Sequence, residues 1–207
     1  MTRRVPEIVL GVTGSIGAYK AADLVRRLKE RSCAVTCIMT KEAREFIAPL
    51  TLEVLSERPI YTELFGLEHP HVIHTTLADQ ADLMLIAPAT ANVIGKLANG
   101  LADDLLTCVA LATNAPILVA PAMNVHMYEH PTVQDNIKRL KTFGYHFVGP
   151  ETGALACGYE AVGHLAEVDT IVQAALQVLS SRPRSSSNKR PASPAKRLPA
   201  TRPLRRA

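Results

Sequence analysis

Three side chains of this 207-residue chain could take part in acid–base or carboxylate chemistry: His74, Asn124 and Cys157. His74 opens the segment HTTLADQAD before an apolar run, and an imidazole there can act as a general base near pH 7. Asn124 follows a proline at the end of another apolar run, and its amide can hold a carboxylate without adding charge. Cys157 lies in GALACGYEAVGHL, a glycine-rich segment typical of a mobile flap. Each also has an ordinary interpretation, as a core histidine, a turn asparagine and an inert thiol.

A fourth feature, GVTGSIGAYK at residues 11–20, joins a predicted strand to a predicted helix. Its glycines let the backbone approach an anion, and the Ser15 hydroxyl and the N–H groups of the helix start can donate to it. The spacing is GxxGxxG, and the next strand ends at Thr40, where a dinucleotide fold has a carboxylate for the ribose. We therefore expect a phosphate site for a mononucleotide. A purely structural glycine turn is the alternative.

Two further apolar runs end in small and polar residues, in APATANVIGKLANGLADDLLT (residues 87–107) and VAPAMNVHMYEHP (residues 119–131). We expect the proline of each APA sequence, Pro88 and Pro121, to end its strand. The small residues after Pro88 leave room for a flat ring, and Thr90 and Asn92 can hydrogen-bond its edge. Thr90 could equally serve only as the N-cap of the following helix.

A scaffold must bring these strand ends together, and the sequence predicts alternating strands and helices. The predicted strands are Glu7–Thr13, Cys33–Met39, Asp82–Ala87, Pro116–Ala120 and His146–Val148. The predicted helices are Ile16–Arg31, Lys41–Ala48, Ala91–Ala98, Asp103–Ala112, Pro131–Thr142 and Val168–Leu179. Because the strands are continuous apolar runs, we expect an α/β fold with a parallel sheet covered by helices on both faces. Ligands in such folds bind at the carboxyl ends of the strands.

The composition limits which groups can hold a ligand and which cellular compartment suits the protein. Hydrophobic residues make up 47% of the chain and aromatic residues only 4%, so backbone and small polar groups must hold most of any ligand. The four cysteines form no CxxC pair, and the chain opens without a signal-peptide pattern, which favours a cytoplasmic protein. The apolar runs are too short to cross a membrane. His69, His71 and His74 lack nearby cysteine or aspartate, so we expect no metal site.

The net charge of +4 conceals an uneven distribution. Residues 181–207 hold nine of the 23 basic side chains and no acidic one, which leaves 14 basic and 19 acidic side chains, a net charge of −5, in residues 1–180. We therefore predict a folded domain over residues 1–180 and a disordered basic tail over residues 181–207. The tail is either a solvated terminus or an arm for an anionic partner whose identity is unknown.

Five motifs in order strengthen these separate hypotheses. They are GSIGAYK, a histidine eight residues before the aspartate of ADL, APATANxxxKxANGxADxLLT, PAMNxxM, and ACGxE followed by Gly-His-Leu. Together, over about residues 5–180, they resemble the homo-oligomeric flavin-containing Cys decarboxylase family. The resemblance implies a three-layer, flavodoxin-like or Rossmann-like domain that binds FMN.

The resemblance also implies roles for individual residues. His74 and Cys157 would be catalytic, and Asn124 and Met127 would bind the substrate. The residues implied to hold FMN are Gly14, Ser15, Ile16 and Thr40 at its phosphate, and Pro88, Ala89, Thr90, Ala91, Asn92 and Ala122 at its ring.

The implied reaction converts 4′-phosphopantothenoylcysteine to 4′-phosphopantetheine in coenzyme A biosynthesis. FMN would oxidise the cysteine thiol to a thioaldehyde, loss of CO2 would give an ene-thiolate, and hydride return with a proton from Cys157 would complete the cycle. The resemblance suggests homotrimers or dodecamers with sites shared between copies. Tyr159 and His164 stand where relatives often have an acid and an arginine. Because only the basic tail follows Leu179, we expect the ligase domain of many bacterial relatives to be a separate protein.

Three alternatives remain from the sequence. A peptidyl-cysteine decarboxylase would need no reductive cysteine, so Cys157 disfavours it. A flavin prenyltransferase shares the fold but is disfavoured by the motifs around His74 and Asn124. A non-catalytic regulatory subunit of the same fold is disfavoured because all three chemical residues occur in one chain.

Overall fold

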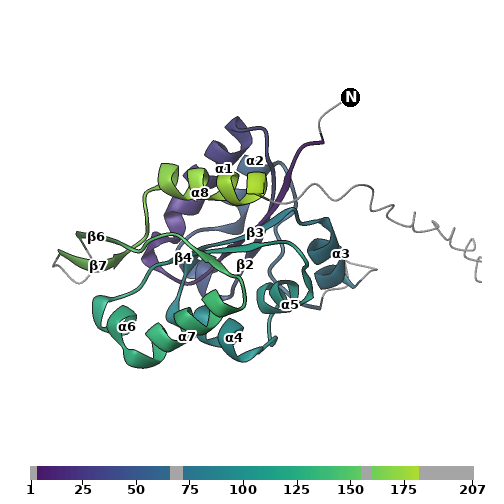
Figure 1. Cartoon of the computed structure of the whole chain (residues 1–207). Helices are drawn as coiled ribbons and strands as arrows, with labels where there is room; N and C mark the ends of the chain where they lie inside the picture. The colour runs from purple at the N-terminus through teal and green to yellow at the C-terminus, as the bar shows by residue number, and fades with distance from the viewer. Residues whose placement is uncertain (1–3, 66–71, 155–159, 182–207) are drawn as a thin grey trace, which may run out of the picture.

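The computed structural model describes residues 4–65, 72–154 and 160–181. Five parallel strands form the central sheet in the order β2-β1-β3-β4-β5 (Figure 1). In chain order these strands are β1 (Glu7–Val12), β2 (Ala34–Met39), β3 (Leu83–Ala89), β4 (Ile117–Pro121) and β5 (His146–Phe147). All five predicted strands are therefore present, with ends that differ from the prediction by one or two residues.

Helices cover both faces of the sheet, which confirms the three-layer α/β fold (Figure 1). One face carries α1 (Lys20–Glu30), α2 (Pro49–Ser56) and α8 (Val168–Ser181). The other carries α3 (Ile73–Gln80), α4 (Ala91–Asn99), α5 (Leu105–Ala112) and α7 (Pro131–Thr142), and the short α6 (Val125–Glu129) follows β4. Two 3-10 turns, η1 (Ile16–Tyr19) and η2 (Glu42–Glu45), complete the connections after β1 and β2.

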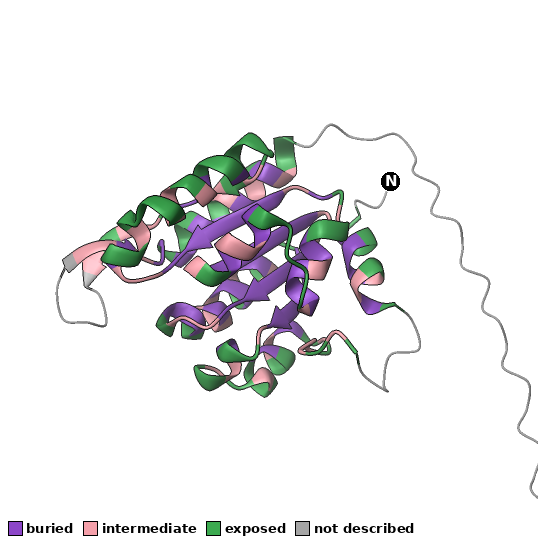
Figure 2. Ribbon diagram, turned by 90° about the horizontal axis from the view of Figure 1, so that it is seen from below, coloured by how far each residue is buried: buried purple, intermediate pink, exposed green. Residues whose placement is uncertain are grey.

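Successive residues of a strand face opposite sides of the sheet, so a strand that is covered by helices on both sides must be a continuous apolar run. In β1, Ile8 and Leu10 belong to the core under α1 and α8, whereas Val9 belongs to the core under α3, α4 and α5. All seven residues of β3 are buried, and the sheet is enclosed between helices whose outer faces are exposed (Figure 2). Burial on both faces confines charged side chains of the central strands to the strand ends, as at Glu7, the first residue of β1.

The glycine-rich segment forms an antiparallel hairpin of β6 (Glu151–Ala154) and β7 (Glu160–His164), which extends beyond the main sheet (Figure 1). We had predicted a flap from residue 153 to 165, and the hairpin occupies that position. Residues 155–159, which include Cys157, lie outside the described residues.

Pro121 is the last residue of β4, as predicted, but the prediction that Pro88 ends its strand was wrong, because Pro88 lies inside β3. The β3–β4 register shifts between Ile86 and Ala89, and a residue without an N–H is tolerated at such an irregularity.

The predicted helix over residues 41–48 is also wrong. Only the 3-10 turn η2 forms there, and α2 begins at Pro49. Proline is favoured in the first turn of a helix, where its missing N–H has no partner to lose. The predicted helix from Ile16 likewise starts as the 3-10 turn η1 before α1.

The strand order places one end of the sheet at a topological switch point. From β1 the chain moves out to β2 on one side and then returns to β3 on the other side of β1. Ligands of open α/β sheets bind outside the carboxyl ends of strands at such a point. Within the described residues, the helices are too short or too polar to cross a membrane.

Candidate active site

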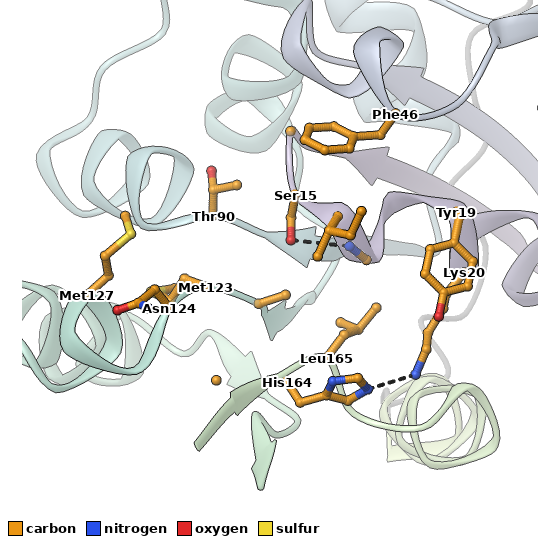
Figure 3. Close-up of a pocket in the computed structure, with 15 residues that line it drawn as sticks. Ser15, Tyr19, Lys20, Phe46, Thr90, Met123, Asn124, Met127, His164 and Leu165 are labelled. Carbon is orange, nitrogen blue, oxygen red and sulfur yellow. Dashed lines mark hydrogen bonds between the residues drawn. The ribbon is translucent and has the colours of Figure 1, made fainter. Parts of the chain in front are cut away.

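A cavity of about 540 Å³ opens at the switch point (Figure 3), a size typical of cofactor and small-molecule sites. Its walls come from the segments that follow β1, β3 and β4 and from the base of the β6–β7 hairpin. The lining residues are Gly14, Ser15, Ile16, Gly17, Tyr19, Lys20, Phe46, Thr90, Ala122, Met123, Asn124, Met127, Gly163, His164 and Leu165.

The loop after β1 is held close to η2. A Cβ atom at Gly14 would lie 2.3 Å from Cβ of Glu42, so only glycine fits at this point. The Ser15 N–H donates to the Thr13 carbonyl at 2.9 Å, and the Ser15 hydroxyl accepts from the N–H of Gly17 at 3.4 Å. Ser15 is therefore the N-cap of η1, and its side chain lies on the cavity wall.

A buried threonine joins this loop to the end of β3. The Thr13 hydroxyl donates to the Pro88 carbonyl at 2.7 Å and accepts from the Thr90 N–H at 3.1 Å. The Thr90 hydroxyl in turn accepts from the N–H of Val93, as the N-cap of α4. Thr90 thus both caps a helix and lines the cavity, which combines the two interpretations that the sequence left open.

Asn124 is the N-cap of α6. Its Oδ1 accepts from the N–H of His126 at 2.9 Å, which directs the oxygen into the cap at the start of α6. Met127 follows on the first turn of α6 and lies half exposed on the cavity wall (Figure 3).

The base of the hairpin is attached to the Asn124 loop. The Met123 N–H donates to the Gly163 carbonyl at 3.0 Å. Gly163 has a φ of +131°, and a Cβ atom there would lie 2.2 Å from the Met123 carbonyl oxygen. Only glycine satisfies both the conformation and the space, so this residue sets how closely the hairpin approaches the cavity.

One group of charged side chains lies on the wall formed by α1 and β7. The Lys20 Nζ is 3.1 Å from the His164 Nε2 and 3.2 Å from the Glu167 Oε1 (Figure 3 shows the first contact). The hairpin base is thereby linked to the start of α1 through His164 and Lys20.

The structure brings seven of the predicted site residues to the cavity: Gly14, Ser15, Ile16, Thr90, Ala122, Asn124 and Met127. Other predicted residues are not among those that line it. Pro88 and Ala89 are buried in β3 beneath the wall, and the Thr40 hydroxyl accepts from the N–H of Ala43 at the start of η2. Ala91 and Asn92 lie in the first turn of α4.

His74 also lies away from the residues that line the cavity. It is half buried in the first turn of α3, a helix that packs against α5. His69, His71 and Cys157 lie outside the described residues. In the part of the chain that the structure describes, His, Cys, Asp and Glu side chains form no group of three suited to a metal ion.

Sequence reasoning missed four lining residues: Tyr19, Lys20, Phe46 and Met123. Tyr19 and Lys20 belong to the GSIGAYK motif, but only its glycines and serine were interpreted. Phe46 could not be found, because it reaches the cavity from the segment that was wrongly predicted as a regular helix.

The three described cysteines are poor nucleophiles. Burial raises the pKa of the Cys37 thiol to about 12, and burial also raises the pKa of Cys33. The pKa of Cys108 is raised as well, by burial first and then by the nearby Asp104 carboxylate. All three therefore remain protonated near pH 7.

The residues present fit a flavin. Five of the lining side chains are aliphatic or methionine and two are aromatic, which suits a flat ring, and hydroxyl groups of Ser15 and Thr90 lie at the strand ends. The glycine at position 14 lets the loop run close to η2, and Thr13 ties that loop to the end of β3. The cavity therefore combines an apolar slot with a polar end, as a flavin requires.

Comparison with known proteins agrees with this assignment. The family model described as Flavoprotein matches residues 2–180. The coenzyme A biosynthesis bifunctional protein CoaBC of Bacillus subtilis is 51% identical over 169 residues, 81% of this chain and 42% of the relative, so the chain spans less than half of that protein. A probable phosphopantothenoylcysteine decarboxylase of Streptococcus mutans is 50% identical over 170 residues, 81% of this chain and 95% of the relative.

A solved structure shows the same fold. A PPC decarboxylase mutant complexed with pantothenoylaminoethenethiol superposes with a TM-score of 0.79 at 32% identity, over 86% of this chain and all of the other. The family match and the cavity together indicate a flavin cofactor. From its fold, its cavity and these matches, the chain belongs to the Flavoprotein family.

Proposed function

We propose that the chain catalyses the FMN-dependent decarboxylation of 4′-phosphopantothenoylcysteine to 4′-phosphopantetheine, a step of coenzyme A biosynthesis. The observation that carries this proposal is that the Ser15 loop and Asn124 line the same cavity. This shared cavity supports the pairing of a candidate cofactor loop with a candidate carboxylate-binding residue. The half-identical relative named as a probable phosphopantothenoylcysteine decarboxylase supports the same reaction.

The cofactor in this proposal is FMN, held at its phosphate by the loop of Gly14, Ser15 and Ile16 and at its ring by Thr90 and Ala122. The lack of a carboxylate at the end of β2, where Thr40 stands, favours a mononucleotide. When bound, the flavin would accept and return the two electrons that make loss of CO2 possible.

Asn124 would bind the substrate carboxylate. Its amide NH2 group is a hydrogen-bond donor, which is chemically suited to a carboxylate oxygen, and the residue lines the cavity. A neutral amide holds the anion without the strong ion pair that an arginine would form, so release of neutral CO2 is not opposed. Met127 and Ile16 would shield the reacting carbon from water.

Cys157 would supply the proton that completes the product, from the hairpin whose base touches the Asn124 loop through Gly163. His74 would act as a base, or hold the substrate, during the first oxidation. We further propose a homotrimer or dodecamer in which a neighbouring copy contributes His74. Its place on α3, apart from the residues that line the cavity of its own chain, supports this arrangement. The buried free thiols of Cys33 and Cys37 favour the cytoplasm as the compartment.

Mass spectrometry of phosphopantothenoylcysteine after incubation with the FMN-loaded protein tests the function. We expect a product that differs from the substrate by loss of CO2 alone, and no product from Asn124→Asp, in which a second carboxylate would repel the first. A product that has also lost two hydrogens would instead identify an oxidative decarboxylase. An unchanged substrate with a flavin-loaded protein would contradict the proposal.

A further inference from the structure

The cavity contains one positively charged wall. Among the described lining residues, Lys20 and His164 are the only ones that can carry a positive charge, and the others are apolar or neutral near pH 7. A cation in a largely apolar cavity loses hydration, so it needs compensation from nearby anions or from a ligand.

The compensation within the chain is incomplete. The Lys20 side chain is only 14% exposed, whereas its partner Glu167 is 65% exposed. Water strongly screens the charge of a carboxylate that is so exposed, so Glu167 contributes little to the stabilisation of the buried ammonium group. The other contact of Lys20 is with the His164 Nε2, which can accept a hydrogen bond only while that nitrogen carries no proton. An ammonium group has three N–H donors, so one remains for an acceptor in the cavity.

Three separate elements hold this pair in place. Lys20 is the first residue of α1, His164 is the last residue of β7, and Glu167 directly precedes α8. The β6 strand packs against the imidazole, since a Cβ atom at Gly153 would lie 3.4 Å from the His164 Cγ. A donor pair fixed from several elements loses little entropy when it binds a ligand.

We propose that Lys20 and His164 form a subsite for a phosphate monoester, namely the terminal phosphate of the substrate. Lys20 would donate directly to the phosphate, and His164 would position the ammonium group from the hairpin. This inference rests on the proposed function, because 4′-phosphopantothenoylcysteine carries its phosphate at the end remote from the carboxylate that Asn124 would hold.

The position of the pair favours the substrate phosphate over the cofactor phosphate. In Figure 3 the Lys20 ammonium turns toward β7 and α8, whereas the Ser15 hydroxyl lies on the other side of the cavity, nearer Thr90. Two phosphates placed at one point would repel each other, so a second anionic ligand requires a second site.

Calorimetric binding to the FMN-loaded protein tests the subsite without relying on turnover. The probes are 4′-phosphopantetheine and pantetheine, which differ only in the phosphate. We expect the wild type to bind the phosphorylated probe more tightly, and Lys20→Met to weaken that probe by about tenfold or more while pantetheine binding stays unchanged. His164→Gln should weaken the phosphorylated probe in the same direction by a smaller factor.

Lys29→Met is the matched control, because Lys29 lies on the same helix but donates to the Leu55 carbonyl away from the cavity. It should leave both affinities unchanged. Equal wild-type affinity for the two probes would overturn the subsite. So would a Lys20→Met protein that loses FMN but keeps riboflavin, since the lysine would then serve the cofactor phosphate. A wild type that prefers the phosphorylated probe but releases no CO2 would contradict the proposed function and leave the subsite supported.

Discussion

At the scale of single residues, Thr13 connects the two strand ends that flank the switch point. Its side chain is 2% exposed, and its hydroxyl both donates to Pro88 and accepts from Thr90. In the proposed FMN site the threonine would act through the position of Thr90, as a positioning residue.

Thr13→Val, which keeps the shape but removes the hydroxyl, should lower stability by about 1–3 kcal/mol, because two buried backbone groups lose a partner. The same change should weaken FMN binding about tenfold if it displaces Thr90 by even a fraction of an ångström. Fluorescence titration with FMN measures the affinity, and urea unfolding measures the stability.

Thr13→Ser restores the hydroxyl and should recover the FMN affinity even if it loses some stability with the methyl group. A valine variant that is destabilised but binds FMN normally would show that Thr13 supports the fold and not the site.

At the scale of elements, the turn between α4 and α5 shows how a long motif can be structural. Gly100 ends α4 with a φ of +68°, and Asp104 caps α5 through a capping box with Thr107. Lys96 reaches from α4 to the carboxylates of both Asp103 and Asp104, at 2.7 and 2.9 Å. Much of the KLANGLADDLLT sequence therefore specifies the joint between two helices.

Asp104→Ala should destabilise the protein by about 1–2 kcal/mol at pH 7, the usual cost of losing an aspartate N-cap. Asp103→Ala is the matched control, because it removes only an exposed ion pair with the same lysine and should cost about 0.5 kcal/mol or less. Urea unfolding of the three proteins measures both differences.

The loss of stability in Asp104→Ala should also depend on pH. Burial opposes ionisation of Asp104, but the hydrogen bond from Thr107 and the contact with Lys96 outweigh it and lower the pKa below 3.8. A lowered folded-state pKa gives stability that is present above the unfolded value and is lost as pH falls through the folded value. The difference between wild type and Asp104→Ala should therefore shrink in acid below about pH 4. An equal difference at pH 7 and pH 3 would contradict the capping role.

Predictions from sequence were most accurate where one physical signal dominated. The apolar runs of β1 and β3 could belong only to a parallel sheet covered on both faces, and α7 was predicted with its observed bounds, Pro131–Thr142. The prediction for residues 41–56 failed because it took no account of Pro49 as a helix start. Pro49 separates η2 from α2.

Predictions for the candidate site were likewise accurate for some residues and not for others. Residues that directly follow strands, such as Ser15, Thr90 and Asn124, could be predicted, because parallel strands end at one edge. Lys20 and Phe46 reach the cavity through the orientation of a helix and of a 3-10 turn, which no pattern in the chain reports. The implied role of Thr40 stays a prediction, since its hydroxyl accepts from the N–H of Ala43 in η2 and the residue is not among those that line the cavity.

At the scale of the whole molecule, the distribution of the three chemical residues bears on assembly. Asn124 lines the cavity, His74 lies on α3, and Cys157 lies outside the described residues. If a neighbouring copy supplies His74, each site combines residues from two chains across an unlike pair of surfaces.

Mixing two inactive variants, His74→Gln and Asn124→Asp, tests this arrangement. After random reassembly, about one quarter of the interfaces would join an intact His74 to an intact Asn124, so activity should return to about that fraction of the wild type. The rate of CO2 release before and after mixing measures it. Each variant incubated alone through the same cycle is the control, and a mixture that remains inactive would place all the residues of a site in one chain.

The two edges of the main sheet limit how copies can join. At one edge β5 contains only two residues, and at the other the Tyr61 segment occupies the hydrogen-bonding groups of β2, with Tyr61 accepting from the Met39 N–H and donating to the Cys37 carbonyl. A sheet with one short edge and one occupied edge offers little template for another strand, and such edges protect proteins against open-ended aggregation. Extension of the main sheet from one copy to the next is therefore disfavoured, so that even at high concentration the protein should form closed, countable particles and not fibres.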